Sequence, residues 1–276
     1  MGLEHTYRGI IHCHSRYSYD AKLSLSELKA LCQKNNIQFV CMTEHVDEMT
    51  SEDAQAFVRE CEALSDEAFL FIPGFEVPYK IEGAKEHAHI LMVGLREFFG
   101  NYAPDIQSLK KWTEKASLVL LAHPVRNNFL VDEGLLEEID ALEVWNQQYE
   151  GKRVPRTRSL ALLGELREKK PTLLGTGGVD FHRTEHFGAP FITLATETLT
   201  EAGVIEKLKI GAFSVSSPQA SFYGTIPNID ECIQKYRFDS LVSVCVIVLG
   251  KFVNATLAKV GIKLPKSLKQ LVRKGI

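Results

Sequence analysis

Residues 37–45, IQFVCMTEH, join a short apolar run to a histidine at its end. The run is rich in branched and aromatic side chains and has the length of one buried strand. Residues 24–35 precede it, with the capping-box pattern Ser24-x-x-Glu27 and leucines at helical spacing. A helix that leads into a buried strand indicates a parallel βα unit.

The same alternation continues along most of the chain. Further helices are predicted at residues 51–65, 105–117, 155–169 and 199–209. Further strands are predicted at residues 7–12, 69–75, 89–94, 118–122, 141–145, 172–177, 190–195 and 211–215. This order of elements favours an α/β fold, either a barrel or a doubly wound sheet.

Residues that can bind metals recur at the ends of the predicted strands and favour the barrel. Such side chains meet at one mouth when parallel strands close into a ring, whereas an open sheet spreads them along an edge. His89 instead stands at the start of its strand, so we expect that strand to be irregular or to run in the other direction. The residues at strand ends are His12, His45, Glu76, His123, Asp180 and His182.

Imidazoles and carboxylates together suit Zn, Mn or Fe, and more than four such ligands imply more than one ion. Any one of these clusters has an ordinary structural explanation, but their joint order along the chain predicts a site for two to three divalent ions. His87 and His89 compete for one ligand position, and the apolar run after His89 favours His89. The predicted metal ligands are His12, His14, Asp20, His45, Glu76, His89, His123, Asp180 and His182.

Composition limits the classes of protein. The chain has 276 residues, 45% of them hydrophobic, which is enough for one sizeable core. Its net charge of −3 does not predict general affinity for nucleic acids. The six cysteines lack Cys-x-x-Cys spacing, and no basic segment followed by an apolar stretch begins the chain. We therefore expect reduced, buried thiols and a cytoplasmic location.

The character of the sequence changes near residue 220. Residues 241–249, LVSVCVIVL, are continuously apolar, and residues 251–276 contain six lysines, one arginine and no acidic residue. The apolar run is shorter than the roughly 20 residues of a membrane span. We favour a terminal helix packed on the barrel with a solvated basic tail over an interfacial membrane helix in residues 240–276. The predicted domains are a barrel, 1–220, and a helical extension with a basic tail, 221–276.

These motifs resemble the PHP (polymerase and histidinol phosphatase) family of metal-dependent phosphoesterases. The resemblance covers about residues 7–216 and implies a distorted (β/α)7 TIM-like barrel with a trinuclear cluster of Zn, Mn or Fe. Many members have histidine where this chain has Asp20, a change that bears on metal affinity or choice. The matching stretches are His12-x-His14, Asp20, Thr43-Glu44-His45, Gly74-Phe75-Glu76, His89, Ala122-His123-Pro124 and Asp180-x-His182.

The resemblance also implies an allotment of ligands among three ions. Glu76 bridges two of the ions. The first ion takes His12, His14, Glu76 and Asp180, the second takes Glu76, His89 and His123, and the third takes Asp20, His45 and His182.

The implied activity is hydrolysis of phosphate esters, in which a metal-activated hydroxide attacks phosphorus. Glu76 and Asp180 would serve catalysis through the ions. Three arginines lie one to three residues from predicted ligands and would orient the phosphate by bidentate hydrogen bonds: Arg16, Arg126 and Arg183. Residues 145–147, Trp-Asn-Gln, end another strand and are weaker candidates for lining the pocket.

Three functions fit this site. The first is a phosphomonoesterase with a small-molecule substrate. The second is a nuclease for short oligonucleotides, which the short span between Glu76 and His123 and the lack of a dense basic stripe disfavour. The third is a non-catalytic, metal-stabilised module that binds a phosphorylated ligand. The sequence does not determine the substrate or the oligomeric state.

Overall fold

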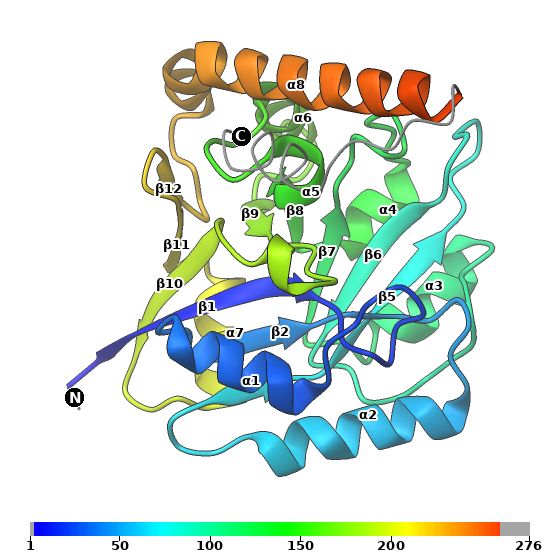
Figure 1. Ribbon diagram of the computed structural model, residues 1–276, viewed down its shortest axis with the longest axis vertical. Helices are drawn as coiled ribbons and strands as arrows, with labels where there is room; N and C mark the ends of the chain where they lie inside the picture. Colours follow the sequence, from blue (N-terminus) through cyan, green and yellow to red (C-terminus); the bar gives the residue numbers. More distant parts are fainter. Residues whose placement is uncertain (1–2, 260–276) are drawn as a thin grey trace.

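The computed structural model describes residues 3–259 of the chain as a mixed α/β fold with two six-stranded sheets (Figure 1). The strand order is β12-β11-β10-β1-β2-β4 in the first sheet and β3-β5-β6-β7-β8-β9 in the second. The strands are β1 (His5–Cys13), β2 (Phe39–Met42), β3 (Glu44–His45), β4 (Leu70–Ile72), β5 (Gly74–Tyr79), β6 (Ala88–Val93), β7 (Leu118–Ala122), β8 (Ala141–Asn146), β9 (Leu174–Gly178), β10 (Phe191–Thr196), β11 (Phe213–Ser216) and β12 (Ser221–Tyr223).

Helices cover the outside of the two sheets. Figure 1 shows α1 and α2 together on one side of the molecule, and α8 along one edge beside α5 and α6. The capping box predicted at Ser24 and Glu27 is present at the start of α1. The helices are α1 (Leu25–Lys34), α2 (Ser51–Leu64), α3 (Ile106–Thr113), α4 (Glu133–Glu138), α5 (Gln147–Glu150), α6 (Thr157–Arg167), α7 (Glu201–Lys209) and α8 (Ile229–Lys259), with a 3-10 helix at Thr184–His186.

The chain passes from one sheet to the other at two single residues. β2 pairs with β1 and β4 in the first sheet, and β3, one residue later, pairs with β5 in the second. Thr43 separates β2 from β3, and Pro73 separates β4 from β5. At Gly74 an added Cβ would lie 2.4 Å from the Met92 carbonyl oxygen, so only glycine fits this crossing.

The two sheets also meet along β1 and the end of β9. The Val179 amide donates to the Ile11 carbonyl (2.9 Å), and the Phe181 amide donates to the His12 carbonyl (3.1 Å). The His14 amide in turn donates to the Phe181 carbonyl (2.9 Å). These bonds bring residues 12–14 beside residues 180–182.

Strand directions depart from a simple series of parallel βα units. β6 runs antiparallel to both β5 and β7, as the position of His89 indicated. The segment between β5 and β6, residues 80–87, contains no helix, and a connection of this kind suits an antiparallel pair. β10, β11 and β12 are also antiparallel to their neighbours, so the expectation of parallel units throughout was wrong there.

The cysteines and α8 agree in part with the expectations. All six cysteines are free; four are buried, while Cys232 is partly exposed and Cys245 is exposed. α8 packs against α5 and α6. No helix within residues 3–259 combines the length and the hydropathy that crossing a bilayer requires. The end of the predicted basic tail, residues 260–276, lies outside the described residues.

Candidate metal centre

Glu76, on β5, lies at the middle of the candidate site with its side chain fully buried. Its Oε2 is 3.0 Å from His12 Nε2 and 3.2 Å from His14 Nε2. Its Oε1 contacts His89 Nδ1 and lies 3.3 Å from His123 Nε2. His45 Nδ1 also lies 3.5 Å from Oε2, so the two carboxylate oxygens face two different groups of imidazoles, as a bridging ligand would.

Asp180 closes one side of the centre. Its Oδ1 lies 3.6 Å from the Nε2 atoms of both His12 and His14, and 3.4 Å from His182 Nδ1. Two ligands on one tetrahedral zinc with bonds of about 2.1 Å are roughly 3.4 Å apart. His12, His14, Glu76 and Asp180 thus have the spacing of ligands around one ion.

The third predicted set is more open. His182 Nε2 lies 3.1 Å from Asp20 Oδ2 and 3.4 Å from His45 Nε2. His45 Nε2 lies 3.8 Å from Asp20 Oδ1. The side chain of Asp20 is 39% exposed, whereas those of the other members are mostly buried, so this set forms the solvent side of the centre.

The structure brings all nine predicted ligands into one cluster. Eight of them form overlapping groups whose donor atoms lie within 4.8 Å of one another: His14, His45 and His182; His12, His14 and Asp180; His12, Glu76 and His123; and His45, Glu76 and His89. The groups share members, so the exact allotment of each residue to an ion stays a prediction. His87 is exposed and stacks on Tyr102, outside this cluster.

Three of the predicted ligands have a left-handed backbone. His12, His123 and Asp180 have φ values of 66°, 23° and 52°. Residues other than glycine rarely adopt this conformation, and such strain concentrates at functional sites. At His12 it accompanies a register shift between β1 and β2, so the strand end is bulged rather than regular. His12 and His14 nevertheless both reach Glu76.

Glu143, on β8, contacts two of the candidate ligands, His12 and His123. Its Oε1 lies 3.0 Å from His12 Nδ1, and its Oε2 accepts a hydrogen bond from the His123 amide (2.7 Å). Asn146 Nδ2 donates to the same Oε2 (2.8 Å) and lies 3.5 Å from Asp180 Oδ2. A carboxylate that orients a ligating imidazole through its other ring nitrogen fixes both the tautomer and the direction of the ring.

Glu44 is a second buried carboxylate that positions residues beside the centre. It is fully buried and accepts hydrogen bonds from the Ser15 amide (2.9 Å) and from the hydroxyls of Ser15 (2.6 Å) and Ser18 (2.5 Å). The Ser18 hydroxyl also accepts a bond from the His45 amide (2.9 Å) and lies 3.3 Å from His14 Nδ1. Glu44 therefore holds residues 15–18 beside the imidazoles.

The electrostatics of the site favour cations. Burial opposes the charged form of Glu76, but the surrounding imidazoles hold the pKa of Glu76 well below its ordinary value. Burial likewise lowers the pKa of His14, yet the nearby carboxylates of Asp180 and Glu76 raise it to about 9. These carboxylates thus favour a proton on His14, whereas burial lowers the pKa of His45 to about 3. Divalent ions would compete with such a proton for the same donor atom.

The donor atoms fit a metal cluster. Four buried polar atoms of the centre have no hydrogen-bond partner among the described residues: His14 Nε2, His45 Nδ1, His123 Nδ1 and Asp20 Oδ1. Buried polar atoms without partners are costly, and metal ligation would satisfy those that face the centre. Imidazole and carboxylate donors are those that Zn, Mn and Fe accept.

Comparison with known proteins agrees with this geometry. The model of one family, described as the PHP domain, matches residues 11–153, slightly more than half of the chain. The chain belongs to the PHP domain family. No curated protein matches its sequence at a significant level.

One solved structure shares the fold of this chain. A two-domain protein from Bacteroides vulgatus, described as containing a predicted PHP-like metal-dependent phosphoesterase, aligns with a TM-score of 0.55 and 13% identity. The alignment covers 77% of this chain and 65% of that protein, so this chain spans just under two thirds of its length. A protein from Bifidobacterium adolescentis, provisionally described as a metal-dependent phosphoesterase, aligns at 19% identity over 72% of this chain and 94% of its own, with a TM-score of 0.47.

The predicted arginines of this PHP domain lie at different distances from the cluster. Arg126 is exposed, and its charge acts on His89 and Tyr149 near the centre. Arg16 is 61% exposed, and its guanidinium lies 3.8 Å from Glu60 on α2. Arg183 is exposed at the start of the 3-10 helix that follows His182. The catalytic roles of all three stay predictions.

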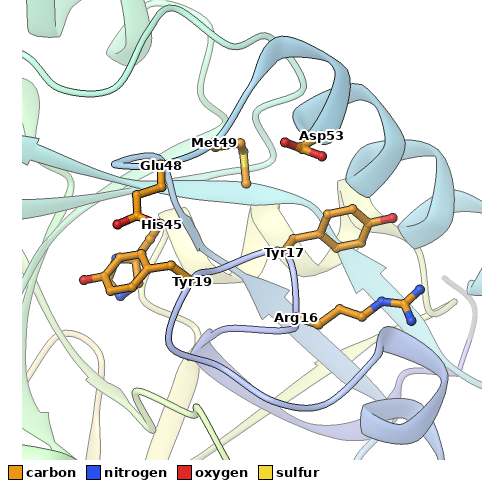
Figure 2. Close-up of a pocket in the computed structure, with 7 residues that line it drawn as sticks. All are labelled: Arg16, Tyr17, Tyr19, His45, Glu48, Met49 and Asp53. Atoms are coloured by element: carbon orange, nitrogen blue, oxygen red, sulfur yellow. The ribbon is translucent and has the colours of Figure 1, made fainter.

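A pocket opens beside His45 of the PHP domain, on the solvent side of the centre. Its volume is about 170 Å³, and its lining comes from the loop after β1, from β3, from the loop before α2 and from α2 itself. Figure 2 shows the Tyr19 ring beside His45, whereas the Arg16 guanidinium points away from that histidine. The centroids of the Tyr19 and His45 rings are 5.4 Å apart. The lining residues are Arg16, Tyr17, Tyr19, His45, Glu48, Met49 and Asp53.

Sequence reasoning missed the residues that support the ligands. Glu143 lies inside an apolar strand, and only its unpaired charge in that run could have drawn attention to it. Of the weaker candidates at residues 145–147, Asn146 contacts Glu143 and Asp180, whereas Trp145 is fully buried and donates to the Gly151 carbonyl. His186, which is not among the predicted ligands, lies with its ring centroid 6.0 Å from that of His182.

Proposed function

We propose that this PHP domain hydrolyses phosphate monoesters of small molecules with the help of two to three divalent ions, Zn, Mn or Fe. The observation that carries the proposal is Glu76, a buried carboxylate whose two oxygens face separate groups of imidazoles. Buried charges of this kind are typical of ligands that are shared by adjacent ions.

The chain's own residues would set the geometry of the reaction. When bound, the ions would supply positive charge to the phosphate oxygens and an activated water for in-line attack at phosphorus. Glu76 and Asp180 would fix the spacing of the ligands, and Glu143 would hold His12 in one orientation. Arg126, at the rim of the centre, would bind a phosphate oxygen and keep the ester in line.

The pocket beside His45 would receive the alcohol part of the ester. Its volume of about 170 Å³ is below the roughly 300–1,000 Å³ of sites for drug-sized ligands, which suits a small alcohol group. Tyr19, which is 59% exposed, offers a ring for packing, while Glu48 and Asp53 place negative charge on the wall. Two carboxylates repel further phosphates, so the pocket favours a small leaving group over an oligonucleotide.

We further propose that the two sheets together form the distorted (β/α)7 barrel that the family resemblance implies. β2 continues into β3 and β4 into β5, which leaves seven strands in the order β1, β2/β3, β4/β5, β6, β7, β8 and β9. The backbone bonds between residues 11–14 and 179–181 support closure of this ring. A ring would explain why ligands so far apart in sequence share one mouth.

The test is phosphate release by the full chain after removal and separate return of Mn, Zn and Fe(II). We expect release from monoesters with small, uncharged alcohols and little cleavage of short oligonucleotides. Cleavage of oligonucleotides in preference to monoesters would identify a nuclease instead. Tight binding of phosphate esters without turnover under any metal would identify a binding module.

A further inference from the structure

The middle of α8 has its polar and apolar faces reversed. Ser240 and Ser243 face the body of the protein and are 3% and 4% exposed. A surface helix ordinarily turns its apolar stripe inward and its polar residues outward. The large apolar residues of α8 lie on the outside instead, 60% to 76% exposed, and form what we call the outer stripe: Phe238, Leu241, Val248, Leu249 and Phe252.

The outer stripe is continuous. Its members recur at intervals that keep them on one side of a helix for about four turns, roughly 20 Å. Figure 1 shows α8 at one edge of the molecule, with α5 and α6 on its inner side. Contiguous exposed apolar surface of this length marks a site of interaction with another molecule or a membrane.

Polar contacts on the inner side fix the rotation of α8. The Ser240 hydroxyl accepts a hydrogen bond from the Thr157 amide (3.1 Å) at the start of α6, which has no side-chain cap of its own. The buried Tyr236 hydroxyl donates to the Ser221 carbonyl (2.9 Å) and accepts from the Ser221 amide (3.1 Å). Turning the outer stripe inward would break these bonds, so its exposure follows from the packing of α8.

Basic residues flank the outer stripe in the sequence. Lys235 and Arg237, just before it, are exposed. Asp239 is the last acidic residue of the chain, and residues 251–276 carry six lysines and one arginine. A second copy of this chain would bring the same positive charges together if the C-terminal halves of two α8 helices paired side by side. Anionic lipid headgroups would neutralise them.

We propose that α8 docks the protein on an anionic lipid surface, with the outer stripe in the headgroup region and the exposed Lys235 and Arg237 beside the phosphates. This contact is independent of the phosphoesterase activity. α8 then lies parallel to the membrane plane, as amphipathic interfacial helices do.

Flotation of the full chain with vesicles tests the proposal. We expect the protein to float with vesicles of phosphatidylcholine and phosphatidylserine, weakly with phosphatidylcholine alone, and less as NaCl is raised from about 0.1 to 0.5 M, because salt screens the headgroup charge. The variant Leu241→Gln/Leu249→Gln/Phe252→Gln should partition at least about tenfold less. Its phosphatase activity and unfolding temperature should match those of the wild type, because these side chains are exposed.

The matched control removes exposed apolar side chains elsewhere. Leu3→Gln/Ile210→Gln replaces residues that are 87% and 59% exposed and should float like the wild type. Wild-type protein that fails to float with anionic vesicles, or a stripe variant that floats equally well, overturns the proposal.

Cys245, exposed among the residues of the outer stripe, gives a second readout. In a Cys232→Ser background, an environment-sensitive fluorophore on Cys245 should shift to the blue when anionic vesicles are added and not when protein concentration is raised without lipid. A shift with protein concentration, together with a dimer by light scattering that the stripe variant abolishes, would assign the stripe to a second copy and reject the lipid surface.

Discussion

Glu76 and Glu143 are both buried carboxylates, but they contact different atoms of the candidate ligands. Glu76 lies among imidazoles contributed by β1, β3, β6 and the end of β7. Glu143 contacts the far ring nitrogen of one of those imidazoles and the amide of another. Changing either should alter metal binding, but to different extents.

Glu76→Gln should lower the number of ions bound per chain and reduce turnover by more than about 100-fold, because an amide is a poor bridging ligand. Metal analysis and phosphate release check this. Glu82→Gln, a change of the same chemistry at an exposed position beyond β5, should leave both unchanged. Full metal content and activity in the Glu76 variant would refute the bridging assignment.

Glu143→Gln should weaken metal binding or activity by about 10- to 100-fold. Glu143 Oε2 accepts hydrogen bonds from the His123 amide and from Asn146 Nδ2. A glutamine NH2 group at the same place is itself a donor, so it could not accept these bonds. Titration of metal-free protein with Zn, followed by activity at saturating metal, separates weaker affinity from a misplaced ligand. Behaviour equal to the wild type in both would show that Glu143 does not orient His12.

At this scale the candidate ligands were easier to identify from the sequence than the residues that contact them. His12, His45 and His123 can be identified from the sequence because imidazoles at the ends of apolar runs are unusual. Glu143 and Glu44 carry no such signal, because their partners are backbone amides and ring nitrogens that only the folded chain brings near.

Among the elements, α5 shows how a short helix after β8 fills the space beside the centre. Glu150, its last residue, is buried, contacts the Asn146 amide, and accepts a hydrogen bond from the Ser159 hydroxyl on α6 (3.1 Å). Burial, with the nearby charge of Glu143, raises the pKa of Glu150 from 4.5 to about 8. The folded protein therefore keeps a proton that the unfolded chain loses.

Replacing Glu150 with Gln should remove a pH dependence of stability. Below pH 4.5 both states hold the proton, and above about pH 8 neither does. Between these values only the unfolded chain ionises, so the wild type's free energy of unfolding falls as pH rises, by at most about 1.4 kcal/mol per pH unit. Denaturant unfolding at pH 5 and pH 8 should show a smaller fall for Glu150→Gln. Equal falls would contradict the raised pKa.

Elements with strong local signals were predicted, and those set by tertiary contacts were not. The capping box at Ser24 and the apolar periodicity of α2 place those helices correctly. The breaks at Thr43 and Pro73 escaped prediction because each apolar run reads as one strand, whereas its two halves pair in different sheets. The direction of β6 was signalled only by the place of His89.

Over the whole molecule, the candidate ligands come from residues 12 to 182 and from both sheets. Ions that bind this arrangement cannot bind the unfolded chain equally well, because the ligands are then far apart. Removal of metal with a chelator should lower the unfolding temperature on the order of 10 °C, taking two sites filled at about 100 times their Kd. Differential scanning fluorimetry with and without chelator measures this. Glu76→Gln should show a smaller shift, and no shift in the wild type would argue against resident ions.

Sequence alone predicted a mixed α/β molecule but not how its sheets divide. Strand and helix alternation is local information, whereas the antiparallel β10–β12 extension depends on which edge of β1 is free to pair. The reversed faces of α8 were equally hidden, because the apolar run at residues 241–249 gives no direction until Ser240 meets α6.

The contact of β1 with the end of β9 also orders events during synthesis. About 170 residues separate His12 from His182, which a ribosome takes roughly 10 to 30 s to add. Throughout that interval His12 and His14 exist without Asp180 and without the backbone bonds that bring residues 12–14 to it. A nascent chain therefore has no complete centre until residue 182 has been added, so binding of ions would follow the synthesis of most of the chain.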